Sequence, residues 1–428
     1  MKKLYCIGLN LLMMTAMLAS CGNNQQNKSD KGFKPALDPN TSCKIRIVGD
    51  YKKFEALEAE FHRFRYFYPH VNFSYKQLEN YNDSIGDYLN GANKPNIFFT
   101  YSSMIGNSKY NDVFAHTEDL NDAKINFDCV REGLLHKEED GSVYMVPIFA
   151  RTYGMLVNND LFEENNLEVP TTYEEFEAVC QAFKENGITS PMMGFTSSSS
   201  SCLMNTVAYP MFVATLAGNA EALELANNLD PSAGEYMRTA LETVYSLFDD
   251  GYVDIDACNA IGTDNYEKVI FRFFDGDVPM MVCTADTASG TTTREATYAP
   301  FANSPFNYSF APIPSTSEGG YFIDSPSVQF SVNKDCDNLD MTNEFMRFLI
   351  SDKELNEMSA VKGLLTPTKT VAFDSLYSPF SGVPAERTFL SEELGIRDAL
   401  AKQIREASFK VGKKSMTVEE AIANYGNF

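Results

Sequence analysis

Apolar and polar residues follow two different periods along the N-terminal part of the chain, and these periods predict strands that alternate with helices. CKIRIVGDY (43–51) alternates like a short strand, and FEALEAEFHRFRYFYP (54–69) places apolar residues at helical spacing up to a proline. VNFSYKQL (71–78) is again strand-like, a helical segment surrounds YNDSIGDYLNG (81–91), and KPNIFFTY (94–101) has the apolar run of a buried strand. This order is typical of the α/β class, in which helices cover a largely parallel sheet.

Polar and aromatic residues follow two of these predicted strands at the point where each strand ends. Asp50 and Tyr51 come after the first strand, and Tyr101, Ser102 and Ser103 come after the third. In open α/β sheets, ligands bind beyond the carboxyl ends of the strands. We therefore expect a binding site that includes both of these strand ends.

The rest of the chain continues to mix helical and strand-like patterns, without a repeat of fixed period. The predicted helices cover residues 173–187, 236–251, 265–277, 341–351, 353–361, 397–408 and 417–425. The predicted strands cover residues 278–284, 308–314 and 327–333.

Length and charge narrow the classes of protein that fit this pattern. A chain of 428 residues with 44% apolar and 22% charged residues is too long for one ordinary hydrophobic core, so two domains are expected. The formal net charge is −23. Nucleic acid binding is not expected, because neutralising phosphates requires clustered Lys and Arg. We interpret the acidity as a solvated surface.

The first twenty residues predict an export signal, because Lys2 and Lys3 precede a short apolar stretch. Residues 18–21, Leu-Ala-Ser-Cys, resemble the lipobox of bacterial lipoproteins, in which the cysteine receives lipid. We therefore expect a signal peptide at 1–20, lipidation at Cys21, a flexible tether at 21–43, and a protein anchored by lipid to the outer face of the cell membrane. The alternative is an ordinary secreted protein with a chance cysteine.

The remaining cysteines and the histidines give no pattern for metal binding or catalysis. The seven cysteines after the lipobox lack a CxxC spacing, so most are expected to be buried reduced thiols. The four histidines are not spaced like ligands, so no metal site and no cofactor are expected. GxSxG and HExxH are also missing from the sequence, and no catalytic residue is assigned. A surface-anchored glycoside hydrolase stays open as an alternative, because glycosidases carry no obligatory short motif.

The stretch VPIFARTYGMLVNNDLFEENNLEVPTTYEEF (146–176) combines a loop carrying Phe149 and Arg151, a strand, and a new helix that Thr172 and Glu175 can begin with a capping box. Its order resembles the extracellular solute-binding proteins of ATP-binding-cassette importers, the group that contains maltose-binding protein. In that family the corresponding motifs are Y-N-K-D-L-F and P-x-T-W-E-E-F. Here VNNDLF and TYEEF stand in their places.

Other segments resemble the same family in the expected order, over about residues 44 to 428. They are FFDGDVPMMV (273–282), NEFMRFLISDKELNEMS (343–359) and the loop KGLLTPTK (362–369). The chain departs from the family where KPNIFF replaces G-x-x-P-D-[IV] and in having no Trp, although sugar-binding members commonly stack sugars on indole rings. The 22 Tyr and 32 Phe still offer aromatic faces.

The resemblance implies a two-lobed α/β fold of the periplasmic-binding-protein type, with interlobe hinge strands and a central cleft that closes on a ligand. It implies crossings between the lobes near 146–149, 282–286 and 348–353. The lobes are then expected to contain residues 44–148 plus 283–350 and residues 149–282 plus 351–428.

The resemblance also implies a binding function without catalysis. The expected ligand is a carbohydrate, specifically an oligosaccharide, which a monomeric protein delivers to the transmembrane subunits of a permease. Another solute such as a polyamine is the alternative, because Asp and Tyr could form a cage for a cation. The ligand-binding residues expected by position are Tyr51, Tyr101, Phe149, Arg151, Ser198, Asp286, Tyr321 and Asp324.

Overall fold

The computed structural model describes residues 32–262, 266–371 and 373–428, and the chain divides into a short unit, Met1–Ala36, and a folded unit, Leu37–Phe428. The predicted signal peptide and the lipidation of Cys21 lie outside the described residues. The backbone N–H of Leu37 donates to the Tyr68 hydroxyl at 3.1 Å. The folded unit therefore begins earlier than the sequence predicted, and the expected tether at 21–43 is too long at its C-terminal end.

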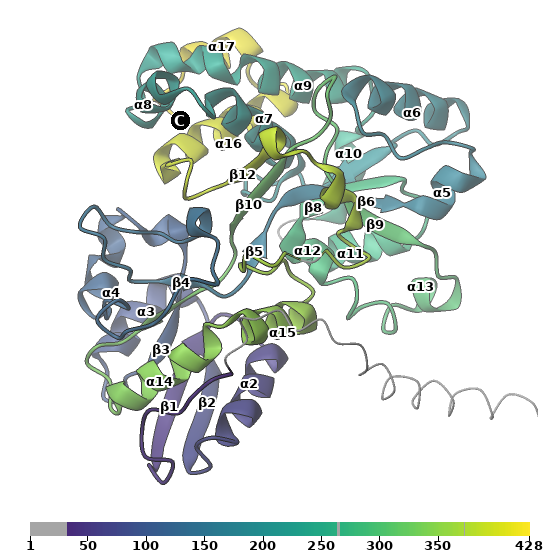
Figure 1. Ribbon diagram of the computed structural model, residues 1–428. Coiled ribbons are helices and arrows are strands. Elements are labelled where there is room, and N and C mark those ends of the chain that lie inside the picture. The colour runs from purple at the N-terminus through teal and green to yellow at the C-terminus, as the bar shows by residue number, and fades with distance from the viewer. Residues whose placement is uncertain (1–31, 263–265, 372) are drawn as a thin grey trace, which may run out of the picture. The chain divides into compact units, whose positions relative to one another are not determined.

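The first lobe of the folded unit contains a five-stranded sheet in the order β2-β1-β3-β11-β4 (Figure 1). Its strands are β1 (Cys43–Gly49), β2 (Val71–Gln77), β3 (Ile97–Thr100), β4 (Val146–Pro147) and β11 (Gln329–Val332). β1 pairs in parallel with β2 and β3, whereas β11 runs antiparallel to both β3 and β4. The predicted parallel core is confirmed, and a strand from much later in the chain completes the sheet.

Helices and aromatic packing cover this first sheet. The helices are α2 (Glu55–Arg65), α3 (Tyr81–Asn90), α4 (Asn111–Ala115), α14 (Leu339–Leu349) and α15 (Asp352–Lys362). The ring of Phe61 in α2 stacks on Phe73 in β2 at 4.4 Å, and Phe345 of α14 packs on the same Phe73 ring at 4.7 Å. Early and late segments of the chain thus share one hydrophobic core.

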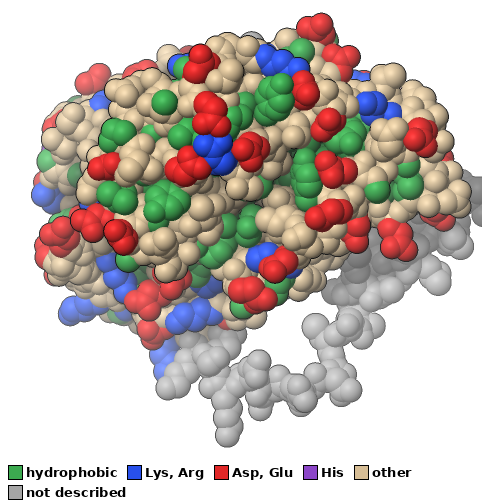
Figure 2. All heavy atoms as spheres, turned by 90° about the horizontal axis from the view of Figure 1, so that it is seen from above, with side chains coloured by type: hydrophobic (Ala, Val, Ile, Leu, Met, Phe, Trp, Pro, Cys, Tyr) green, Lys and Arg blue, Asp and Glu red, His purple; other side chains and the backbone are tan. Residues whose placement is uncertain are grey.

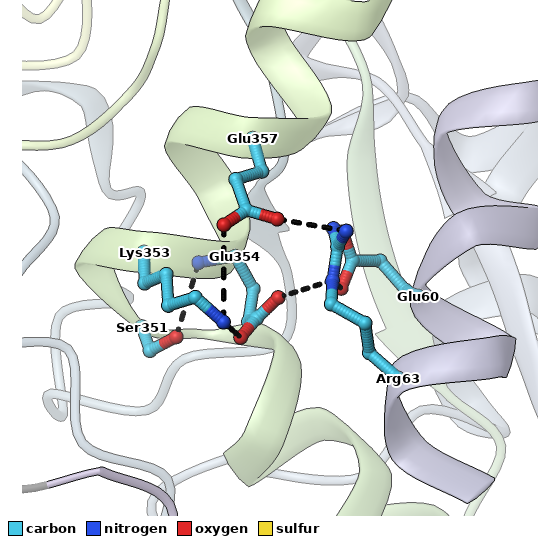
Figure 3. A network of polar contacts seen from close by, with 6 residues as sticks. All are labelled: Glu60, Arg63, Ser351, Lys353, Glu354 and Glu357. Carbon is cyan, nitrogen blue, oxygen red and sulfur yellow. Dashed lines mark hydrogen bonds and ion pairs between the residues drawn. The ribbon is translucent and has the colours of Figure 1, made fainter. Parts of the chain in front are cut away.

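A polar network fixes α15 on α2 (Figure 3). Arg63 of α2 donates to Glu60 of the same helix and forms ion pairs with Glu354 and Glu357 of α15, each at 2.7 Å. Lys353 adds a further ion pair to Glu354 at 3.0 Å. Glu60 and Glu354 are buried, and Arg63 and Lys353 provide the polar and charged partners that such groups require.

The second lobe contains a four-stranded sheet in the order β7-β8-β6-β9. Its strands are β6 (Tyr153–Asn158), β7 (Met192–Gly194), β8 (Met280–Thr284) and β9 (Tyr308–Ala311). Its helices are α5 (Asn159–Glu164), α6 (Tyr173–Glu185), α7 (Leu203–Leu216), α8 (Ala220–Asn227), α9 (Arg238–Asp249), α10 (Ile255–Ile261), α11 (Tyr266–Phe274), α12 (Ala285–Ser289), α13 (Ala299–Asn303), α16 (Asp398–Gly412) and α17 (Val418–Ala423).

Three further features bear on the sequence predictions. The capping box of α6 is confirmed, because the Glu175 N–H donates to the Thr172 hydroxyl at 3.3 Å and the Glu175 carboxylate accepts from the Thr172 N–H at 3.2 Å. On the face of the molecule in Figure 2, acidic side chains are spread among polar and basic ones, which fits the expected solvated surface. Within the described residues the seven cysteines are all unpaired, and four of them are buried.

A small three-stranded sheet, the connecting sheet, joins the lobes in the order β12-β10-β5. It consists of β5 (Ala150–Arg151), β10 (Phe322–Pro326) and β12 (Thr388–Leu390). β10 pairs antiparallel with β5 and parallel with β12. The chain passes from the first sheet to the second between β4 and β6, and the first crossing was expected in this region, near 146–149.

The other two crossings lie later in the chain than the sequence predicted. β8 and β9 both pair with β6, so residues 283–311 stay in the second lobe and the chain returns through β10 into β11. α15 still packs on α2 through the Arg63 network, so the chain leaves the first lobe only after residue 362. The predicted crossings at 282–286 and 348–353, and the lobe boundaries drawn from them, are therefore wrong.

Candidate functional site

A cavity of about 930 Å³, the central cavity, lies between the two lobes beside the connecting sheet. The first lobe lines it with Asp50, Tyr51 and Tyr101, which follow β1 and β3. The second lobe lines it with residues between 284 and 297, which lie at and after the end of β8, and β5 contributes Arg151. Strand ends from both sheets thus meet at one cavity, as is usual for ligand sites in α/β folds.

Aromatic packing fixes the ring of Tyr51 at the end of β1. The ring lies edge-on to Phe54 at 5.2 Å and to Phe99 at 5.5 Å. Gly49 allows this arrangement, because a Cβ at that position would lie only 2.4 Å from the Phe99 ring. Burial raises the pKa of Tyr51 well above its ordinary value, and Asp286 and Asp50 add to the shift. Tyr51 therefore keeps its proton and can donate a hydrogen bond at neutral pH.

Asp286 connects three parts of the fold at the wall of the cavity. Its Oδ2 accepts from Nη1 of Arg151 in β5 at 3.1 Å, and its Oδ1 accepts from the Ser327 hydroxyl between β10 and β11 at 2.7 Å. The side chains of Arg151 and Asp286 keep 42% and 33% of their surface exposed. Burial by itself lowers the pKa of Arg151, but the Asp286 carboxylate outweighs this and raises it. Arg151 therefore stays charged, and both side chains line the cavity.

Asp50 and Tyr101 form a second polar pair at the first-lobe wall. Burial raises the pKa of Asp50, and burial together with the Asp50 carboxylate raises the pKa of Tyr101. The tyrosine hydroxyl therefore remains a donor while the aspartate offers acceptor oxygens. Groups of this kind can orient a polyhydroxylated ligand.

Three residues that the sequence did not single out also line this cavity: Lys362, Tyr266 and Arg294. Lys362 ends α15, and its Nζ lies 4.1 Å from the centroid of the Tyr51 ring. Arg294 lies 5.1 Å from the Tyr266 ring and donates to the Tyr266 hydroxyl at 2.9 Å. Lys362 begins the loop KGLLTPTK that carried part of the family resemblance, so a signal was present; Tyr266 and Arg294 lie outside every motif.

Two of the predicted site residues are buried away from the cavity. Phe149 has no exposed surface and packs on Phe54 with ring centroids 5.8 Å apart, so its ring belongs to the core. Asp324 also has no exposed surface and forms an ion pair with Arg131. Burial raises the pKa of Asp324 to about 6, while Arg131 opposes the shift. The structure thus corrects both assignments, because residues 146–150 are all buried, as is Asp324 in β10.

Two others lie near the lobes' junction but not at the central cavity. The ring of Tyr321 lies 6.2 Å from Phe389, beside β12. Ser198 is exposed and does not line the cavity, whereas Ser200 and Ser201 of the same loop do. The serine-rich loop therefore borders the cavity through Ser200 and Ser201 rather than through the predicted Ser198.

A second cavity of about 1160 Å³ borders the other edge of the connecting sheet, where it is lined by Leu390 of β12. The Ser102 hydroxyl donates to Glu392 Oε1 at 2.9 Å, and His136 Nδ1 lies 3.1 Å from Glu392 Oε2. The bond to Glu392 raises the pKa of His136. Ser102 and Ser103, which follow β3, line this cavity rather than the central one.

Two negative findings apply to the part of the chain that the structure describes. It holds no group of three His, Cys, Asp or Glu side chains arranged to bind a metal ion. Among its helices, none combines the length and the apolar character needed to cross a membrane.

One protein family matches most of the chain. Residues 62–379 match the sequence profile of a family described as bacterial extracellular solute-binding protein. Among curated proteins, none matches the chain.

Solved structures share the fold at low sequence identity. RafE from Streptococcus pneumoniae, in its apo form, superposes with a TM-score of 0.68 at 18% identity, covering 91% of this chain and 99% of RafE. The GacH receptor of Streptomyces glaucescens gives 0.67 at 18% identity, with 91% and 97% covered. A sugar transporter from Bacillus licheniformis in complex with stachyose gives 0.61 at 16% identity, with 90% and 99% covered. These matches confirm the two-lobed fold.

Proposed function

Because the chain belongs to the bacterial extracellular solute-binding proteins, we propose that it captures an oligosaccharide in the central cavity and delivers it to the transmembrane subunits of an ATP-binding-cassette importer. The observation that carries the proposal is the cavity itself. Its volume of about 930 Å³ suits a ligand of several sugar rings, and it is lined by tyrosines, hydroxyls and charged groups from both lobes. A ligand held by both lobes would stabilise their closed arrangement.

The structural neighbours support a carbohydrate as the ligand. RafE has been solved in complex with raffinose, the Bacillus licheniformis protein with stachyose, and GacH with acarbose. A polyamine fits less well, because five basic side chains line the cavity and would repel it. The family consists of solute-binding proteins, and a binding function without catalysis is therefore part of the proposal.

Export of the chain fits this function, since the family is extracellular. We propose lipid attachment at Cys21 and a protein that acts as a monomer on the outer face of the cell membrane. Cys21→Ala should move the protein from the membrane fraction to the soluble fraction of the cell envelope or medium. An unchanged membrane-bound share would contradict lipidation at this residue.

Calorimetric titration of the purified mature protein tests the carbohydrate function. Raffinose, stachyose, acarbose and chitin oligosaccharides form the first panel, with spermidine as the competing ligand class. At least one saccharide should bind, and Tyr51→Ala should weaken that binding, because the ring faces the cavity. Tyr245→Ala is the matched control, since Tyr245 lies on α9 and is exposed outside the cavity. Binding of spermidine without any saccharide would overturn the proposal.

A further inference from the structure

The charges around the central cavity differ from those of the whole protein. The chain has 58 acidic and 35 basic residues, so acidic groups dominate overall. The cavity reverses this balance, with five basic side chains and four acidic ones. The basic side chains are Lys52, Lys53, Arg151, Arg294 and Lys362, and the acidic ones are Asp50, Glu55, Glu267 and Asp286. A local excess of cations in a concave site raises the local concentration of anionic ligands.

Ion pairs within the wall account for only part of these cations. Arg151 pairs with Asp286 at 3.1 Å, and Arg294 Nε lies 3.5 Å from Glu267. In the described residues, neither Lys362 nor the neighbouring pair 52–53 forms an ion pair. These lysines are therefore available to a ligand.

Lys362 is the most confined of the three lysines. It is half-buried at the end of α15, with its Nζ 4.1 Å from the centre of the Tyr51 ring. Burial lowers its pKa, and the carboxylates of Asp286 and Glu55 act in the opposite direction. The ammonium has lost part of its hydration and has a cation–π contact but no ion pair among the described residues, so an anionic ligand group would be a favourable partner.

The second lobe repeats this arrangement across the cavity. Arg294 lies 5.1 Å from the Tyr266 ring. In each lobe, then, a cation occupies the face of a tyrosine that lines the cavity. A neutral sugar that stacked on either face would have to displace the cation, whereas an acidic sugar could bind the cation where it lies.

We propose that the saccharide captured in the central cavity is acidic, carrying a uronate carboxylate or a sulfate ester that pairs with Lys362. This inference rests on the proposed carbohydrate function and adds to it the charge of the ligand. Lys52 and Lys53 lie at the same wall and attract the same group, while Asp50 and Asp286 accept hydrogen bonds from sugar hydroxyls.

Titration calorimetry with matched saccharides tests the inference. Oligogalacturonides, oligoglucuronides and sulfated galactose oligosaccharides are compared with neutral galactose and glucose oligosaccharides of the same length. At least one acidic series should bind about tenfold or more tightly than its neutral counterpart. Lys362→Gln should weaken acidic binding by roughly tenfold to a hundredfold. It should not weaken neutral binding, because it removes the cation that covers the Tyr51 ring. Added salt should weaken only the acidic series.

Lys76→Gln provides the matched control. Lys76 also lies over a tyrosine, 4.7 Å from the Tyr88 ring, but outside the central cavity, so its loss should not change affinity. Equal or tighter binding of a neutral saccharide, unaffected by Lys362→Gln, would overturn the acidic ligand while leaving the carbohydrate function intact. Failure of every saccharide to bind would overturn both. The acidic series that binds shows whether the ligand carries a uronate carboxylate or a sulfate ester.

Discussion

Asp286 links two parts of the cavity wall, because its carboxylate accepts hydrogen bonds from both Arg151 and Ser327. If Arg151 and Asp286 also orient the ligand, Arg151→Ala or Asp286→Ala should cost on the order of 1.5 to 3 kcal/mol of saccharide binding. The melting temperature should change little, since a partly exposed ion pair contributes about 0 to 1 kcal/mol to stability. Calorimetric titration beside thermal unfolding measures both quantities.

Ser327→Ala separates the two roles of this cluster, because it removes a partner of Asp286 without removing a charge. Its affinity should stay close to that of the parent. If Arg151→Ala lowers the melting temperature but leaves affinity intact, the pair acts only as a structural bridge between the walls.

Glu60 predicts a pH dependence of stability. Burial, reinforced by the neighbouring Glu354, raises the pKa of Glu60 from 4.5 to about 8 although Arg63 opposes the shift. Between these values the folded protein holds a proton that the unfolded chain has released. The free energy of unfolding therefore decreases as pH rises from about 5 to 8. Melting curves across this range should show a flatter profile for Glu60→Gln than for the parent.

Glu58→Gln serves as the control for that measurement, because Glu58 is exposed on the same helix. It should keep the parental pH profile. An identical slope for the parent and Glu60→Gln would show that Glu60 does not titrate in this range.

Single site residues could be predicted where a strand end alone defines their position, as for Asp50, Tyr51 and Tyr101. Phe149 and Asp324 could not, because they lie in segments that cross between the lobes and are almost entirely buried, at 146–150 and 322–326. The residues that reach the cavity from these crossings are Arg151, Ser327 and Val328. The sequence marks the crossing but does not show which face the lobes cover. The sequence analysis did not single out Lys362, because its place at the cavity depends on where the C-terminal end of α15 lies in the fold.

Elements with one buried face were predicted well, and α7 shows why others were not. α2, α6, α9 and α16 show apolar residues at helical spacing because each keeps a solvent-exposed face. α7 is buried over nearly its whole length and contains Pro210, so its sequence carries no polar stripe and includes a residue that disfavours helices. Periodicity cannot reveal a helix that is apolar on every side.

The packing of α16 on α7 gives a test at this scale. A Cβ on Gly412 of α16 would lie 2.6 Å from Cγ of Met204 in α7 and 3.0 Å from the Phe248 ring. Gly412→Val should therefore destabilise the fold by about 1 to 3 kcal/mol, measured by denaturant unfolding. Gly382→Val should be tolerated, because no atom lies within 4 Å of a Cβ there. Equal stability of the two variants would show that the contact between α7 and α16 can accommodate a larger side chain without loss of free energy of unfolding.

At the scale of the whole molecule, the three crossings give a hinge rather than a single flexible linker. We expect ligand binding to move the lobes as rigid bodies, since β5 and β10 are hydrogen-bonded to each other within the connecting sheet. Small-angle scattering should show a smaller radius of gyration with saturating saccharide than without it. A value that stays constant at saturation would rule out closure, though not binding.

The position of β11 between β3 and β4 also determines when the first sheet can be completed during biosynthesis. When β3 emerges from the ribosome, its partner β11 has not been made, and at about 5 to 20 residues per second it follows roughly 10 to 50 seconds later. Until then the edge of β3 has no strand to pair with, and the first lobe cannot complete its fold. Export through a translocation channel that accepts only unfolded chains would benefit from this delay. We expect the late synthesis of β11 to keep this chain competent for passage during that interval.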